Sequence, residues 1–318
     1  MDWLDPEVLQ VGGKSVARGE FSTIRLEFAR LPTGTVIDTR VHVFRGAEAG
    51  PVILLQGGLH GDEIGGVEIL RRMVRSKAFA PIRGSVVVVP ILNVFGFLHF
   101  SRDVPDGKDI NRSFPGLRRG SLAARVAYQV SEYLLPLIHC GIDFHTGGAR
   151  RDNFPQIRYT PDSESAAELA RAFGAPFSKP TKTIPKSFRR TCHDAGIPII
   201  VYEGGESLGI DEQVVGEGID GALRVLAHLG IHDSGPELPA SSNELVDSRW
   251  LRAPRSGLFH PTVHNGSRVD KGDVVGILGD AYGGREKKIL THQDGWVICV
   301  NRLPVVNQGD ALVHIGMA

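Results

Sequence analysis

The chain has 318 residues with 36 basic and 36 acidic side chains, and this zero net charge gives no reason to expect a nucleic acid or an anionic membrane surface as a partner. Its opening residues lack the basic-then-apolar pattern of a secretory signal, and no apolar run approaches the roughly 20 residues of a membrane span. Three widely spaced cysteines fit neither a disulfide framework nor a CxxC metal site, so we expect reduced thiols in a cytoplasmic protein.

The first half of the chain alternates predicted strands and helices. Residues 22–30 and 35–44 alternate apolar and polar side chains in places, which predicts two antiparallel strands. A buried strand over 52–55 and a β-branched strand over 85–90 flank a helical spacing of apolar residues over 64–74. Strand, helix and strand in this order indicate an α/β layer with a largely parallel core.

A histidine and an acidic residue follow the first buried strand directly. Gly57 and Gly58 end the strand, and His60 and Glu63 stand three residues apart, so that their side chains can converge on one helical turn. Imidazole and carboxylate together suit a borderline metal such as zinc. Taken alone, the motif favours a blander interpretation, in which Asp62 caps the next helix and His60 is a surface residue.

A long polar loop is predicted over 93–117, and loops of this length are usually functional. Asn111 and Arg112 lie side by side in it and could bind a carboxylate, because arginine offers a planar fork of donors. A helix is predicted over 122–137.

A further strand over 140–148 carries Asp143 and His145, whose side chains share one face because they are two residues apart. A histidine at the carboxyl end of a strand lies where open α/β sheets bind ligands. From this segment alone, a metal ligand and a core histidine held by Asp143 are equally good interpretations, and Asp143 could also orient His145.

The strand predicted over 197–203 ends in Glu203. A carboxylate is costly to bury at the end of an apolar strand, which favours a functional role for Glu203. The other elements predicted in this region are a strand over 156–160 and helices over 163–173, 187–195 and 214–229.

The residue composition and the predicted elements change after residue 231. Residues 232–248 are rich in Pro, Ser, Gly and acidic side chains and are predicted to form a linker. Beyond it, short β runs alternate with turns, and a Gly-Asp pair recurs at 272–273 and 309–310. We therefore predict an α/β domain over 1–231 and a small all-β barrel of two similar halves over 249–318.

These motifs together resemble the succinylglutamate desuccinylase/aspartoacylase family, which is related to the zinc carboxypeptidases. The resemblance spans roughly residues 50–205, and the C-terminal segment looks like the biotinyl/lipoyl-like β-barrel of such proteins. It implies a three-layer αβα fold with a mixed, largely parallel sheet, and it is nearer to bacterial predicted deacylases than to aspartoacylase. The motifs that carry it are His60-x-x-Glu63, the loop over 109–112, Asp143-Phe-His145 and Glu203.

The resemblance also implies a role for each matching residue. His60, Glu63 and His145 would bind one zinc ion, and Glu203 would be the general base. Arg102 corresponds to an arginine that polarises the scissile carbonyl. The substrate would be held by Asn111 and Arg112 at its carboxylate and by Arg158, while Tyr282 is a candidate for a tyrosine that closes the site.

The implied activity is zinc-dependent hydrolysis of the amide bond of a small N-acyl amino acid or related N-acyl amine. A metallocarboxypeptidase or esterase using the same site, and a metal-free binding protein, are the alternatives. A carrier role for the barrel is disfavoured, because the segment Gln293–Trp296 lacks the lysine that such carriers present at a hairpin tip. The expected partner is a small carboxylate-bearing N-acylated molecule, with no nucleic acid or membrane, and homo-oligomers are allowed.

Overall fold

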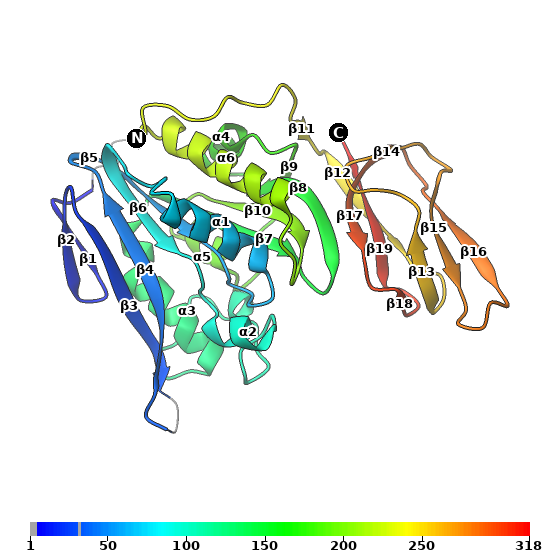
Figure 1. Cartoon of the computed structure of the whole chain (residues 1–318), viewed down its shortest axis with the longest axis horizontal. Coiled ribbons are helices and arrows are strands. Elements are labelled where there is room, and N and C mark those ends of the chain that lie inside the picture. Colours follow the sequence, from blue (N-terminus) through cyan, green and yellow to red (C-terminus); the bar gives the residue numbers. More distant parts are fainter. Residues whose placement is uncertain (1–4, 31–32) are drawn as a thin grey trace.

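A large mixed β-sheet runs through the computed structural model, which describes residues 5–30 and 33–318 (Figure 1). Its strand order is β12-β19-β17-β8-β10-β7-β5-β6-β4-β3. The bounds are β3 Phe21–Arg30, β4 Val36–Arg45, β5 Glu48–Gln56, β6 Arg83–Val89, β7 Cys140–Gly147, β8 Arg151–Tyr159, β10 Ile199–Glu206, β12 Asp247–Arg252, β17 Gly295–Asn301 and β19 Ala311–Met317. Short strands complete this sheet at β9 Phe177–Pro180, β11 Asn243–Glu244 and β14 Arg268–Val269, and β1 Val8–Val11 pairs with β2 Lys14–Ala17 outside it.

The centre of the sheet is parallel and its flanks are antiparallel. Strands β6, β5, β7 and β10 run parallel to one another, whereas β4 and β8 on either side run antiparallel to their inner neighbours. The sheet is thus mixed, as predicted, and besides its four central strands the short strands β9 and β11 also pair in parallel, β9 with β8 and β11 with β9.

Helices cover both faces of the sheet (Figure 1). Strand β5 shows why, because Ile53 and Leu55 enter one hydrophobic cluster, whereas Val52 and Leu54 enter the other. Helices α1, α4 and α6 contribute to the first cluster, and α3 and α5 contribute to the second. The helices are α1 Ile64–Arg75, α2 Val94–His99, α3 Leu122–Tyr133, α4 Glu164–Phe173, α5 Phe188–Asp194 and α6 Glu212–His228, with 3₁₀ turns at Ile110–Arg112 and Leu135–Leu137.

Several elements depart from the boundaries that the sequence predicts. The loop over 93–117 contains α2, whose first turn is capped by the Asn93 side chain, and a 3₁₀ turn. The helix predicted over 122–137 ends at Tyr133, because Pro136 allows only a 3₁₀ turn after it. Strand β8 begins five residues before the predicted start at 156, and β12 begins inside the predicted linker.

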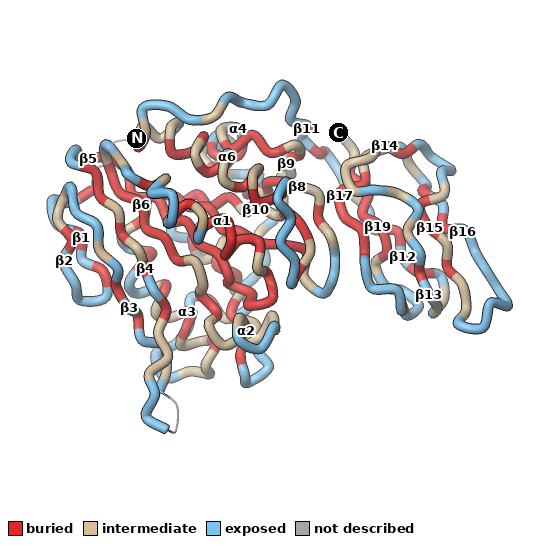
Figure 2. Tube along the Cα trace, viewed as in Figure 1, coloured by how far each residue is buried: buried red, intermediate tan, exposed pale blue. Residues whose placement is uncertain are grey.

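The C-terminal strands form two sheets packed around one apolar core. Strands β12, β17 and β19 continue the large sheet, since β17 pairs with β8. A second sheet has the order β16-β15-β13-β18, and its Phe259 and Leu278 pack with Val297 and Val313 of the first. Figure 2 shows this buried interior beside a largely exposed β16. The bounds are β13 Gly257–Pro261, β15 Val274–Gly279, β16 Glu286–Leu290 and β18 Val305–Val306.

The described helices include none that is both long and apolar enough to cross a membrane.

Candidate metal centre and active site

The candidate site lies where the parallel strands β5, β7 and β10 end. Gln56 pairs in register with Asp143 across β5 and β7, and His145 pairs with Glu203 across β7 and β10. The carboxyl ends of parallel strands meet at one edge of a sheet, so residues far apart in sequence become neighbours there.

The turn between β5 and α1 brings His60 and Glu63 to this edge. Glu63 is the N-cap residue of α1 but makes no side-chain capping bond, so its carboxylate is available to the imidazoles. Gly66 lets α1 lie against β7, because a Cβ atom there would stand 2.7 Å from the carbonyl oxygen of Phe144. The interpretation of His60 as a surface residue is wrong, because its side chain is buried and the residue is only 3% exposed.

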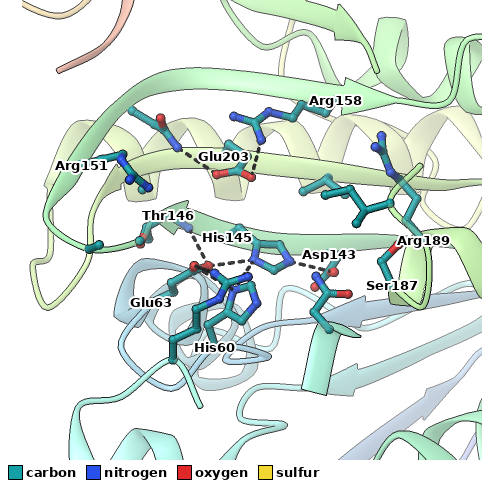
Figure 3. Close-up of a pocket in the computed structure, with 18 of the residues that line it drawn as sticks. His60, Glu63, Asp143, His145, Thr146, Arg151, Arg158, Ser187, Arg189 and Glu203 are labelled. Atoms are coloured by element: carbon teal, nitrogen blue, oxygen red, sulfur yellow. Dashed lines mark hydrogen bonds and ion pairs between the residues drawn. The ribbon is translucent and has the colours of Figure 1, made fainter. Parts of the chain in front are cut away.

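The imidazole of His145 on β7 meets the imidazole and the carboxylate of this turn (Figure 3). The Nδ1 atoms of His60 and His145 lie 2.8 Å and 2.7 Å from the two carboxylate oxygens of Glu63. The two Nδ1 atoms are 3.2 Å apart, and the three candidate ligand atoms all lie within 4.8 Å of one another. The structure therefore brings the three predicted metal ligands together.

The electrostatics of the three groups favour a bound cation. Burial opposes ionisation of Glu63, but the imidazoles of His60 and His145 outweigh it and hold the pKa of Glu63 below its usual value. Burial likewise opposes protonation of His145, yet Asp143 and Glu63 raise its pKa well above the usual value. A carboxylate kept ionised beside two imidazole nitrogens can bind a divalent metal, and two nitrogens with one carboxylate suit zinc.

Two further carboxylates orient the imidazoles from behind. Asp143 accepts a hydrogen bond from Nε2 of His145 at 2.8 Å, which leaves Nδ1 of that ring to face the centre, and the Gln56 amide donates to Asp143 at 3.2 Å. Asp109 lies 3.5 Å from Nε2 of His60. Asp143 thus contacts His145, as two of the interpretations of this segment allowed.

Glu203 lies across the cavity from the centre and is held by two donors of β8. Asn153 donates to one of its oxygens at 2.8 Å and Arg158 donates to the other at 2.9 Å (Figure 3). Arg158, predicted to bind substrate, thus pairs with the predicted base in this structure.

The three other predicted residues also line the cavity. Arg102 lies 3.2 Å from Nδ1 of His60 and donates two hydrogen bonds to Asp109 at 3.0 Å and 2.8 Å. The side-chain oxygen of Asn111 accepts from the Phe188 amide at 2.9 Å, so its amide nitrogen is available to a ligand. Arg112 stands 3.9 Å from Asp109. Their roles in substrate binding stay predictions.

The cavity has a volume of about 680 Å³, enough for a small molecule. Its wall includes residues that no sequence motif marks, because they come from the start of β8, from β9, from α5 and from the C-terminal strands. These are Arg151, Asn153, Lys179, Arg189, Trp250 and His314. Tyr282, by contrast, is 97% exposed in the turn between β15 and β16 and does not line the cavity.

Comparisons with known proteins agree with the motifs. Residues 49–229 match the family model of the succinylglutamate desuccinylase/aspartoacylase catalytic domain. An N-alpha-acetyl-L-2,4-diaminobutyric acid deacetylase from Halomonas elongata is 30% identical over 288 residues, which cover 84% of this chain and 82% of that protein.

Solved structures show the same fold. A succinylglutamate desuccinylase/aspartoacylase from Rhodobacter sphaeroides superimposes with a TM-score of 0.83 at 27% identity, covering 93% of this chain and 95% of the other. The product-bound ectoine utilization protein EutE (DoeB) from Ruegeria pomeroyi gives 0.84 at 24% identity, with 94% and 95% covered. The match extends through the C-terminal strands as well as the α/β part.

Proposed function

Since the chain belongs to the succinylglutamate desuccinylase/aspartoacylase family, we propose that it is a zinc-dependent deacylase that hydrolyses the amide bond of a small N-acyl amino acid or related N-acyl amine. The observation that carries this proposal is the convergence of His60, Glu63 and His145 in one cavity with Glu203. The relative from Halomonas elongata, named as a deacetylase, supports amide hydrolysis as the reaction.

His60, Glu63 and His145 would hold one zinc ion per chain and leave a coordination position open. When bound, the zinc would supply a Lewis acid that lowers the pKa of water and polarises a carbonyl oxygen.

The other residues bind substrate and move protons. Glu203 accepts a proton from the attacking water and returns it to the leaving amine, so that the products are a carboxylate and a free amine. The Arg102 guanidinium faces the centre and donates to the oxygen on which negative charge develops. Arg112 and the free amide nitrogen of Asn111 hold the carboxylate of the substrate.

We further propose that the C-terminal strands form a small barrel-like domain that closes one side of the site. Trp250 of β12 and His314 of β19 line the cavity and stack with ring centroids 4.3 Å apart, which supports this role. The three cysteines are buried and free, which fits the expected reducing, cytoplasmic compartment.

The test is a substrate screen on protein loaded with zinc and on the same protein after chelation. We expect amine release from N-acyl amino acids, its loss on chelation and its return with zinc. Elemental analysis should give one zinc per chain, and the double variant His60→Ala, His145→Ala should retain none. Faster cleavage of peptides or esters would favour the carboxypeptidase or esterase alternative, and a loaded but inert protein would indicate a binding protein.

A further inference from the structure

One carboxylate of the cavity has a buried oxygen that lacks a hydrogen-bond partner. Asp62 lines the cavity and is 8% exposed, and none of the described residues donates a hydrogen bond to its Oδ1 atom. Asp62 does not cap α1, because the N-cap residue of that helix is Glu63. An ionised carboxylate oxygen can only accept hydrogen bonds, and leaving it buried without a donor is costly. This oxygen therefore favours a ligand that brings the donor.

The other carboxylates that line the cavity already have partners in the described chain. Glu63 contacts both imidazoles of the metal centre, and Glu203 accepts from two donors of β8. Asp109 accepts from an arginine, and Asp143 lies 2.8 Å from a ring nitrogen of a histidine. A donor on a bound substrate would thus find its free acceptor at Asp62.

Asp62 lies between the metal centre and the end of β10. In the sequence it stands between the proposed ligands His60 and Glu63. Its carbonyl oxygen accepts a hydrogen bond at 2.8 Å from the amide of Leu208, which follows directly after β10, the strand that carries Glu203. The backbone of Asp62 is therefore fixed beside both the proposed metal ligands and the strand of the proposed base.

Hydrolysis of an amide at this centre brings one further nitrogen donor close to it. The scissile nitrogen is bonded to the carbonyl carbon at about 1.3 Å, and in a secondary amide it carries a hydrogen. When Glu203 returns its proton to this nitrogen, positive charge develops there and the C–N bond breaks. A fixed carboxylate beside the nitrogen stabilises that charge, whereas the bridging oxygen of an ester has no hydrogen to donate.

We propose that Asp62 is a specificity-determining residue whose free Oδ1 accepts a hydrogen bond from the scissile N–H, so that the site selects secondary amides over esters. The proton that the leaving nitrogen gains comes from Glu203, and Asp62 neither gains nor loses one. This inference rests on the proposed deacylase function and deepens it, because an esterase using the same site is the alternative.

The kinetic test compares N-acetyl-L-alanine with O-acetyl-L-lactate, which differ only in that an oxygen replaces the scissile N–H. In the zinc-loaded protein, Asp62→Leu should lower kcat/KM for the amide by about 10- to 100-fold, the range of one charge-assisted hydrogen bond, and leave the ester nearly unaffected. Asp62→Asn keeps an acceptor oxygen without its charge and should lower the amide-to-ester ratio by about 3- to 10-fold. Zinc content should match that of the parent.

Three kinetic results would overturn the proposal. The first is an equal loss for amide and ester, which is what a merely structural role of Asp62 would produce. The second is an unchanged amide-to-ester ratio in Asp62→Leu or, if that variant does not fold in a thermal unfolding measurement, in the isosteric Asp62→Asn. The third is a loss confined to N-acetyl-L-2,4-diaminobutyrate, which would make a side-chain ammonium the partner of Asp62.

Thr146→Val is the matched control. The Oγ1 atom of Thr146 is also buried without a partner among the described residues, and Thr146 is 3% exposed. It directly follows His145 on β7, so its side chain points to the opposite face of the strand. This variant should leave the amide-to-ester ratio unchanged. A change as large as that of Asp62→Leu would attribute the selectivity to packing around the centre and contradict the contact.

A binding measurement separates failure of this contact from failure of the proposed function. Calorimetry on zinc-loaded Glu203→Gln needs no turnover, and N-acetyl-L-alanine should bind at least 10-fold more tightly than O-acetyl-L-lactate. Adding Asp62→Leu should remove that difference. If it does, while the parent hydrolyses no acyl compound, the deacylase is contradicted and the contact is kept. Amide hydrolysis by the parent, with equal affinities for both compounds, would do the reverse.

Discussion

At the scale of single residues, Glu203 is partly buried and is held by two donors, Asn153 and Arg158. We expect Glu203→Gln to keep the shape of the site and to remove the proposed general base. Its kcat should fall by about 10²- to 10⁴-fold, the usual loss when general acid–base catalysis is removed. Zinc content and substrate affinity, measured by elemental analysis and calorimetry on one sample, should stay near those of the parent.

Asn153→Asp is a second variant that tests the role of Glu203. It replaces the amide that donates to Glu203 with a carboxylate of the same size. It should weaken catalysis through charge repulsion while leaving the three metal ligands untouched. Loss of metal from Glu203→Gln would make Glu203 a ligand, and full activity would place the base elsewhere.

His314 gives the protein a specific acid sensitivity. Burial, Lys179 and Arg158 lower the pKa of His314 to about 3, so the folded protein keeps this ring neutral where the unfolded chain protonates it near 6.5. Between these two pKa values the unfolded state binds more protons than the folded state. The free energy of unfolding should therefore decrease as the pH is lowered through this range, by up to about 1.4 kcal/mol per pH unit. Urea unfolding at pH 7 and pH 5 should show a smaller loss for His314→Gln than for the parent. Equal losses would contradict the assignment.

Site residues that belong to short local motifs could be predicted from the sequence. Site residues that only the fold brings together could not. His60, Glu63, His145 and Glu203 end or follow apolar strands, where their chemistry stands out. Lys179 and Arg189 have no such signal, because a lysine in a four-residue strand and an arginine in a short helix usually face solvent. Only the packing of β9 against β8 and of α5 against β10 brings them to one cavity.

At the scale of elements, the turn that carries His60 and Glu63, two of the three proposed metal ligands, depends on one close backbone contact. A Cβ atom on Gly61 would stand 1.9 Å from the Gly96 carbonyl carbon and 2.1 Å from the Phe97 amide nitrogen, both in α2. We expect Gly61→Ala to displace this turn from α2, to destabilise the fold by about 1–3 kcal/mol as overpacking does, and to reduce zinc content. Thermal unfolding and elemental analysis are the measurements.

Gly216→Ala is the control for this prediction. Gly216 lies inside α6, and a Cβ atom there meets nothing within 4 Å. The substitution should stabilise the protein by about 0.5–1 kcal/mol, because it reduces the freedom of the unfolded chain, and should leave the metal in place. If Gly61→Ala also keeps its metal and its stability, the contact with α2 is not what positions the ligands.

Sequence patterns predicted long elements well and short or interrupted ones poorly. The β-branched run of β6 and the periodic apolar positions of α1 lie where they were expected. The predicted start of β8 at residue 156 is too late, because Pro155 lies inside the strand. A proline in a run of residues argues against a strand when only the sequence is considered. Helix α2 was missed since six residues carry too little periodicity to recognise.

At the scale of the whole molecule, the C-terminal strands are an extension of the catalytic sheet. Cys299 of β17 pairs in register with Asn153 of β8, and Asn265 donates to the Asp152 carbonyl oxygen at 2.7 Å. We expect removal of residues 249–318 to expose the β8 edge, which would promote aggregation, and to abolish activity. Light scattering and circular dichroism of the truncated chain test this expectation.

A shortened turn is the control for the truncation. Replacing residues 280–285, around the exposed Tyr282, with a two-residue Asn-Gly turn removes chain without touching β17. This variant should keep full activity. A truncated chain that stays monomeric and folded, with its zinc, would instead support two independent domains divided at the predicted linker.

The pairing of β17 with β8 also determines what random mutagenesis of this protein would reveal. Asn153, which positions Glu203, has the backbone of β17 as its neighbour across the sheet. Substitutions that deform β17 would therefore displace Asn153 and, through it, the proposed base Glu203, although β17 lies far from both residues in the sequence. A genetic screen for inactive but abundant protein should return substitutions in residues 295–301 as well as at the site residues where β5, β7 and β10 end. Residues 295–301 could then be mistaken for catalytic residues.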